Sequence, residues 1–126
     1  MDVCVITASA SDEETTKRVT RVLDEYRITY ETHVDSAHRE PDKVKEIVQR
    51  SQARVFIAIA GLAAALPGFV ASLTKKPVIG VPVSAKLGGL DALLATVQMP
   101  KGVPVAAVGI DNGENAAHLA KRILDA

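Results

Sequence analysis

The sequence predicts an α/β fold, a three-layer sandwich with a central five-stranded parallel sheet. Apolar runs alternate with amphipathic helical patterns at regular intervals along the chain. This alternation is typical of a parallel sheet covered by helices on both faces. At 126 residues we expect a single domain over residues 1–126, because a chain this long buries roughly 65–70% of its unfolded surface on folding.

Five apolar runs are the expected strands: Val3–Thr7, Ile28–Val34, Val55–Ala60, Val78–Val81 and Val105–Ile110. The third and fifth runs are almost continuously apolar, which is the pattern of strands buried on both faces. A sheet built in this way belongs to the flavodoxin-like or Rossmann-like class of folds.

Helix-start signals and apolar spacing predict helices between these strands. Ser11 and Glu14 form a capping-box pattern before the first helix. Pro41 fits the first turn of the second helix, and the last helix is expected over residues 115–124. The expected apolar faces, in chain order, are Thr15, Val19, Val22, Leu23 and Tyr26; Val44, Ile47 and Val48; and Leu119, Ala120, Ile123 and Leu124.

The segment Val55–Leu73 has no charged residue and is about the length that spans a bilayer. However, Gly61, Pro67 and Gly68 interrupt it, and its composition changes from β-branched to alanine-rich. A strand, a glycine turn and a buried helix explain this change better than a membrane helix. With no signal peptide visible at the N-terminus, we expect a cytoplasmic protein that has no membrane partner.

Composition excludes several classes of function. Fifteen basic residues balance fifteen acidic ones, and only 3% of residues are aromatic, so nucleic-acid binding is not expected. The histidines are His33, His38 and His118, and the one cysteine is Cys4. Cys4 lies in an apolar run, which favours a buried thiol over a reactive nucleophile. A lone cysteine forms no intramolecular disulfide.

Loops at the carboxyl ends of parallel strands build the ligand site in such folds. In the loop Ala8–Asp12, small residues and a helix N-terminus suit a phosphate group; a simple capped turn is the alternative. In the loop Ser36–Pro41, His38 places an imidazole that titrates near neutrality beside the cation Arg39. A solvated loop is the alternative there.

The third loop, Gly61–Gly68, is apolar and could wall a pocket against water, or be no more than a tight strand-to-helix turn. His33 falls in the second strand and His118 in the last helix, where packing or surface roles are expected. The sequence has no Cys/His spacing typical of a metal site and no Walker-type phosphate loop, so we expect no metal and no cofactor.

Taken together, the loops resemble those of the PurE family of purine biosynthesis. Members of this family rearrange N5-carboxyaminoimidazole ribonucleotide to 4-carboxy-5-aminoimidazole ribonucleotide, or carboxylate 5-aminoimidazole ribonucleotide directly with carbon dioxide. The resemblance covers nearly the whole chain. The matching stretches are Ser9-Ala10-Ser11-Asp12, Ser36-Ala37-His38-Arg39, Leu66-Pro67-Gly68, Gly80-Val81-Pro82-Val83, Leu90-Asp91-Ala92-Leu93-Leu94, Val97-Gln98-Met99-Pro100 and Gly102-Val103-Pro104-Val105.

The resemblance implies a mutase that needs no cofactor, whose partners are a ribonucleotide substrate and carbon dioxide. It also implies a homo-oligomer, an octamer in this family. His38 would be the catalytic residue and would carry the proton between the ring carbon and the leaving carboxylate. The implied substrate-binding residues are Ser9, Asp12 and Arg39, with Ser11, Ser36, Ala37, Gly61 and Leu66 completing the pocket.

Three positions depart from the family pattern. Ala65 stands where the mutase branch has histidine, and Ala8 and Leu62 each replace a glycine. Direct carboxylation and a non-catalytic nucleotide-binding homologue therefore remain alternatives. A flavin carrier is disfavoured because the loops lack aromatic residues. The chain also ends before the C-terminal arm of many members, so a weaker octamer is expected.

Overall fold

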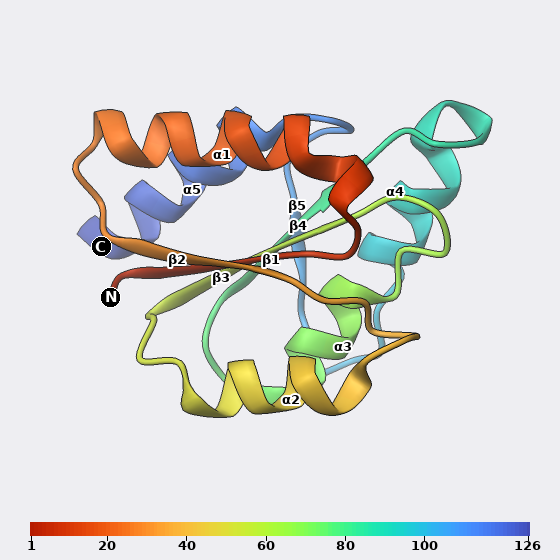
Figure 1. Cartoon of the computed structure of the whole chain (residues 1–126), viewed down its shortest axis with the longest axis horizontal. Helices are drawn as coiled ribbons and strands as arrows, with labels where there is room; N and C mark the ends of the chain where they lie inside the picture. The colour runs from red at the N-terminus through yellow and green to blue at the C-terminus, as the bar shows by residue number, and fades with distance from the viewer.

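Five parallel strands form the centre of the computed structural model, which describes residues 1–126 and confirms the predicted α/β sandwich (Figure 1). The strand order is β2-β1-β3-β4-β5, and every neighbouring pair is parallel. The strands are β1 (Val3–Thr7), β2 (Tyr30–Val34), β3 (Val55–Ala60), β4 (Val78–Pro82) and β5 (Ala106–Ala107).

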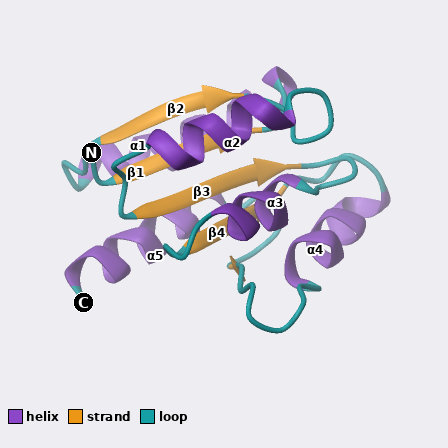
Figure 2. Cartoon of the chain, turned by 90° about the horizontal axis from the view of Figure 1, so that it is seen from below, coloured by secondary structure: helices purple, strands orange, loops and turns teal.

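Helices cover both faces of this sheet. Helices α1 (Glu13–Glu25) and α5 (Gly113–Asp125) pack together on one face. Helices α2 (Pro41–Arg50), α3 (Leu66–Leu73) and α4 (Leu90–Val97) lie on the other, which faces the viewer in Figure 2. Two short 3-10 helices, η1 (Ala10–Asp12) and η2 (Leu87–Gly89), precede α1 and α4.

The core is split by the sheet into two clusters of 14 buried residues each. Successive side chains of a strand point to opposite faces, so Val3 and Val5 join the cluster under α1 and α5, and Cys4 and Ile6 join the other. Every residue of β1 and β3 is buried, as the apolar runs predict. The uncharged segment forms β3, a turn at Gly61 and α3, and none of the helices could cross a membrane.

The prediction for the fifth strand is wrong in length, because only Ala106 and Ala107 pair with β4. Pro104 has no N–H to donate before the strand, and Gly109 turns the chain after it with φ of 125°. The strand is at the sheet edge, and Ala106 is exposed rather than buried on both faces. The second strand also begins at Tyr30, two residues later than predicted.

The predicted capping box is also wrong. Helix α1 begins at Glu13 with Asp12 as its N-cap residue, and the Asp12 side chain does not cap it. Ser9 caps η1 instead, because its Oγ accepts the N–H of Ser11 at 3.3 Å. At the other end Tyr26 lies beyond the helix and is 39% exposed, so it does not belong to the buried face.

Candidate active site

Backbone hydrogen bonds join the starts of the three predicted loops at the carboxyl edge of the sheet. Asp35 N donates to Thr7 O at 2.9 Å, which joins the end of β2 to the end of β1. Ala8 N donates to Ile59 O at 2.9 Å, which joins the first loop to the end of β3. The loops therefore start from one rigid edge of the sheet, as expected for a parallel α/β protein.

The first loop presents two exposed hydroxyls and one buried carboxylate. The Oγ atoms of Ser9 and Ser11 are 3.0 Å apart. Asp12 is only 9% exposed, and its carboxylate forms no hydrogen bond in the chain. Burial, and then the nearby charge of Asp111, raise the pKa of Asp12. Because buried polar groups are normally paired, this carboxylate is suited to accept hydrogen bonds from a ligand.

The second loop is organised by Ser36. Its Oγ accepts the backbone N–H groups of His38 and Arg39, each at 3.2 Å, and its carbonyl oxygen accepts that of Glu40 at 2.8 Å. Ala37 packs against the core together with Ala8. The side chains of His38 and Arg39 are exposed, and Arg39 forms no ion pair. The loop thus offers an imidazole and an unpaired guanidinium on a fixed backbone.

The third loop passes close to the loop that follows β4. A Cβ atom on Gly61 would lie 3.2 Å from the Val83 carbonyl oxygen, which is tighter than ordinary contact. Leu66 is 1% exposed at the start of α3 and packs in the core cluster on that face of the sheet. Leu62 is 69% exposed, and Ala65 is exposed at the N-cap of α3. The divergent positions Leu62 and Ala65 therefore lie on the surface of this loop.

The structure brings the three loops to one edge but does not link their functional side chains. Neither His38 nor Arg39 bonds to Ser9, Ser11 or Asp12.

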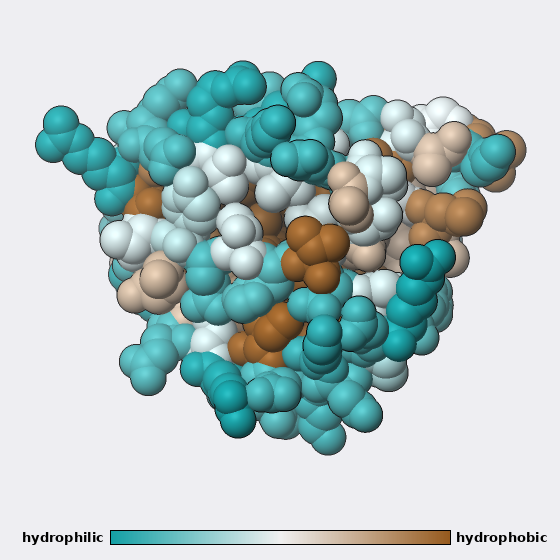
Figure 3. Space-filling view, in the orientation of Figure 1, coloured by the Kyte–Doolittle hydropathy of each residue, from teal (hydrophilic) through white to brown (hydrophobic).

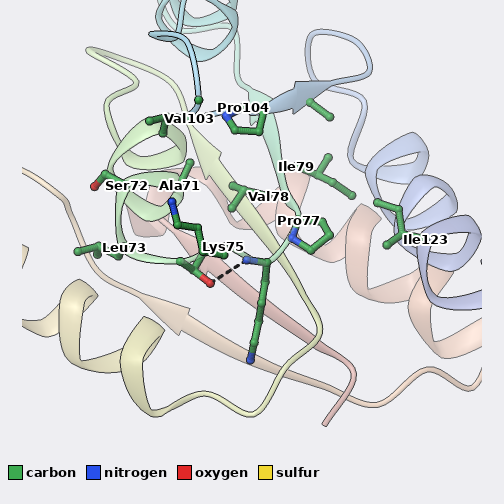
Figure 4. A pocket seen from close by; sticks show the side chains of 14 residues that line it. Ala71, Ser72, Leu73, Lys75, Pro77, Val78, Ile79, Val103, Pro104 and Ile123 are labelled. Carbon is green, nitrogen blue, oxygen red and sulfur yellow. Dashed lines mark hydrogen bonds between the residues drawn. The ribbon is translucent and has the colours of Figure 1, made fainter.

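A surface pocket lies at the opposite edge of the sheet. It has a volume of about 700 Å³ and is walled by the amino ends of β4 and β5, with Pro77, Val78, Val103 and Pro104 among its residues (Figure 4). None of the predicted site residues lines it.

The remaining histidines and the cysteine have local partners. His118 is exposed on α5, and its Nδ1 is 2.6 Å from the Tyr26 hydroxyl, so the predicted surface role is confirmed. His33 is on β2, with Nε2 2.7 Å from Glu31 Oε1. Cys4 is fully buried, which confirms the predicted buried thiol, and desolvation raises the pKa of that thiol to about 12.

A parallel sheet in the order 2-1-3-4-5 defines the flavodoxin-like class of α/β proteins, in which ligands bind at the β1/β3 switch point. The family profile described as AIR carboxylase matches residues 2–126. The chain belongs to this family, the PurE family of purine biosynthesis.

Individual relatives agree with the family match. The N5-carboxyaminoimidazole ribonucleotide mutase of Methanocaldococcus jannaschii is 62% identical over 122 residues, which are 97% of this chain and 78% of the relative. The mutase of Pyrococcus horikoshii is 52% identical over 126 residues, covering 97% and 71%. The crystal structure of Treponema denticola PurE has a TM-score of 0.88 at 30% identity, covering 98% of this chain and 79% of that chain.

Proposed function

We propose that the chain converts N5-carboxyaminoimidazole ribonucleotide into 4-carboxy-5-aminoimidazole ribonucleotide, with His38 as the proton carrier. This assignment depends on one observation. Ser36 Oγ accepts the backbone N–H groups of His38 and Arg39, and this turn lies at the sheet edge that the first loop also occupies. The mutase names of the two archaeal relatives support the same reaction.

Substrate binding is assigned to the first two loops. Arg39 is a cation with no protein partner, and the N–H groups at the start of η1 and α1 lie on the same edge, so together they suit the phosphate. The buried carboxylate of Asp12 suits the ribose hydroxyls, which are donors. The hydroxyls of Ser9 and Ser11 can donate to phosphate oxygens or accept from the ribose.

The chemical step transfers one carboxyl group and one proton within the substrate. The carbamate N–C bond breaks and releases carbon dioxide, while protonated His38 gives its proton to the ring-bound nitrogen. The ring carbon then attacks carbon dioxide and forms the new C–C bond. Neutral His38 removes the proton from that carbon, which restores the aromatic ring and the starting state of the enzyme.

Carbon dioxide must stay beside the ring between the two halves of the reaction. The apolar third loop, with Gly61 close to the β4 loop and Leu66 buried, is assigned to exclude water and retain the gas. Ala37 and Ala8 add an apolar floor that contacts the core. No group on this loop can transfer a proton, so the proton chemistry rests on His38.

Ala65 favours direct carboxylation of 5-aminoimidazole ribonucleotide as a second candidate, because it stands in place of the histidine of the mutase branch. That reaction uses only the later steps described above, in which the ring carbon attacks carbon dioxide and His38 removes the proton from that carbon. The proposal is tested by incubating the purified protein with the carbamate and following the carboxylated product by NMR. We expect product with the wild-type chain and none above background with His38→Asn.

Oligomer formation is assigned to an apolar surface beside the site. Its exposed side chains lie on the third loop, η2 and α4, at the right of Figure 3. They are Leu62, Leu87, Leu90, Leu94 and Val97, exposed by 69%, 78%, 54%, 44% and 44%. Several large apolar side chains exposed on neighbouring elements are typical of a protein contact surface.

We therefore propose a homo-oligomer, an octamer by family resemblance. The measurement is mass by size-exclusion chromatography with light scattering. Leu94→Glu is expected to lower the mass, and the matched control Lys45→Glu on α2 is expected to keep it. A wild-type mass equal to that of one chain would contradict this part of the proposal.

A cytoplasmic location is part of the same proposal. The only cysteine is a free, buried thiol, which fits a reducing compartment. Cell fractionation of the native source would test it, and recovery with secreted proteins would contradict it.

A further inference from the structure

Three metal-ligating side chains lie together where β1 meets β2, on the sheet face covered by α2. Cys4 comes from β1, and Glu31 and His33 come from β2. The parallel register pairs Cys4 with Glu31 and Ile6 with His33, so all three side chains project from the same face. Their ligand atoms all lie within 4.8 Å of one another.

Glu31 is the centre of the cluster. Its Oε1 accepts a hydrogen bond from Cys4 Sγ at 3.7 Å and is 2.7 Å from His33 Nε2. Its other oxygen, Oε2, accepts the hydroxyl of Ser51 at 3.2 Å. The Ser51 hydroxyl, which is outside the trio, therefore orients the Glu31 carboxylate. Metal ligands are commonly oriented by an outer hydrogen-bond partner of this kind.

We propose that Cys4 Sγ, a Glu31 carboxylate oxygen and His33 Nε2 bind a zinc ion. Zinc accepts sulfur, nitrogen and oxygen ligands in tetrahedral geometry, and three protein ligands leave the fourth position to water. A thiolate with an imidazole favours zinc over magnesium or calcium, which prefer oxygen ligands alone.

Two of the three side chains, Glu31 and His33, can be reached from the surface, and Cys4 lies behind them, fully buried. Glu31, His33 and Ser51 line a surface pocket of about 470 Å³, whose far wall is α2. Cations on that wall have carboxylate partners on the same helix or at its start, since Lys43 pairs with Glu40 at 3.0 Å. In the same way, Arg50 pairs with Glu46 at 2.9 Å. The two cations of α2 that line this pocket are therefore both paired, and Lys45, the remaining cation of α2, does not line it.

Metal binding requires only small movements of these side chains. Tetrahedral bonds of zinc to oxygen and nitrogen place the two atoms about 3.3 Å apart, against 2.7 Å between Glu31 and His33 here. The ion displaces the thiol proton of Cys4, which is released to solvent, and the Nε2 proton of His33, which exchanges through solvent so that the neutral imidazole keeps its proton at Nδ1. The bonds to zinc replace the hydrogen bonds within the trio. The bound ion would then tie the edge strand β2 to β1.

The test uses the purified full-length chain after chelator treatment. Zinc affinity is measured by competition with a chromophoric chelator, and cobalt(II) replaces zinc as a spectroscopic probe. We expect one metal per chain, tetrahedral cobalt absorption, and a thiolate-to-cobalt charge-transfer band. Cobalt bound only with an octahedral spectrum and no thiolate band would overturn the assignment.

Single variants distinguish zinc bound by this trio from zinc bound by a histidine elsewhere on the surface. His33→Gln is expected to weaken zinc binding by about 100-fold or more, and Cys4→Ala to abolish the charge-transfer band. The control His118→Gln removes an exposed histidine on α5, away from the trio, and is expected to keep both signals. His33 is partly exposed, so its variant folds even if Cys4→Ala does not. Equal zinc affinity in the wild-type chain and in His33→Gln would refute the proposal.

Discussion

The Oγ atom of Ser36 lies 3.2 Å from the backbone nitrogen of His38 and accepts its hydrogen bond. The same oxygen accepts the N–H of Arg39 at 3.2 Å. These two bonds turn the chain between β2 and α2, so the imidazole and the guanidinium start from a defined backbone. The position of His38 in the proposed reaction therefore depends on a hydroxyl two residues earlier.

Ser36→Ala removes both bonds while keeping the fold of the sheet. By analogy with helix-capping hydroxyls, the loss costs about 1 kcal/mol of unfolding free energy. We expect kcat to fall and Ser36→Thr to restore most of it, because threonine keeps the acceptor. Steady-state kinetics and thermal melts measure both effects. Unchanged kcat in Ser36→Ala would show that this turn does not position His38.

His38→Asn removes the proposed proton carrier but leaves the Ser36 turn intact. We expect turnover to fall by at least about 1000-fold, within the range of general acid–base catalysis. Nucleotide affinity should stay within about tenfold, or about 1.4 kcal/mol, because the other binding groups remain. Calorimetry measures the nucleotide affinity, and steady-state kinetics measures the turnover. The control His118→Asn, on α5, should match the wild-type chain; turnover at the native rate in His38→Asn would refute the catalytic assignment.

Asp12→Asn should stabilise the chain while weakening substrate binding. The pKa of Asp12 is raised above 3.8 by burial and by Asp111. The folded chain therefore binds this proton more tightly than the unfolded chain does. Stability is lost as pH rises from 3.8 through the folded-state pKa, and the loss persists at pH 7. The asparagine variant escapes this penalty.

The stability gain is measured by denaturant unfolding at pH 7 and at acidic pH. It should be present at pH 7 and vanish below pH 3.8, where Asp12 is protonated in both states. The exposed Asp42→Asn on α2 serves as the control and should give no gain. A less stable Asp12→Asn chain at pH 7 would mean that the carboxylate has a structural partner.

Ala65→His tests whether the alanine form is already competent. Ala65 is exposed at the start of α3, so a larger side chain needs no repacking of the core. We expect kcat with the carbamate to change by less than threefold. A large gain from a rate near zero would instead identify the native chain as a nucleotide-binding homologue that has lost its activity. Ala63→His, on the same loop, controls for a nonspecific effect.

Much of the fold could be predicted because burial on both faces leaves a clear pattern. The bounds of β1 and β3 match the prediction, since every residue of each is buried. The fifth strand was predicted too long because an apolar run does not reveal that Pro104 and Gly109 limit pairing. Helix α4 was missed because its apolar residues lie on exposed as well as buried positions.

The loop residues of the candidate site were predicted from motifs, but their surroundings were not. Asp111 acts on Asp12 across 99 positions of sequence, which no local pattern encodes. The Cys4, Glu31 and His33 cluster was also missed, because its members are brought together only by strand pairing. The sequence did contain one signal of this cluster: Glu31 and His33 are two positions apart on one strand, which places both side chains on the same face of the sheet.

The most direct test of the central claim compares carboxyl donors with the same purified protein. One assay supplies N5-carboxyaminoimidazole ribonucleotide, and the other supplies 5-aminoimidazole ribonucleotide with bicarbonate and carbon dioxide. The account predicts faster formation of 4-carboxy-5-aminoimidazole ribonucleotide from the carbamate. Faster product from the free ribonucleotide, or no product from either donor, would contradict it.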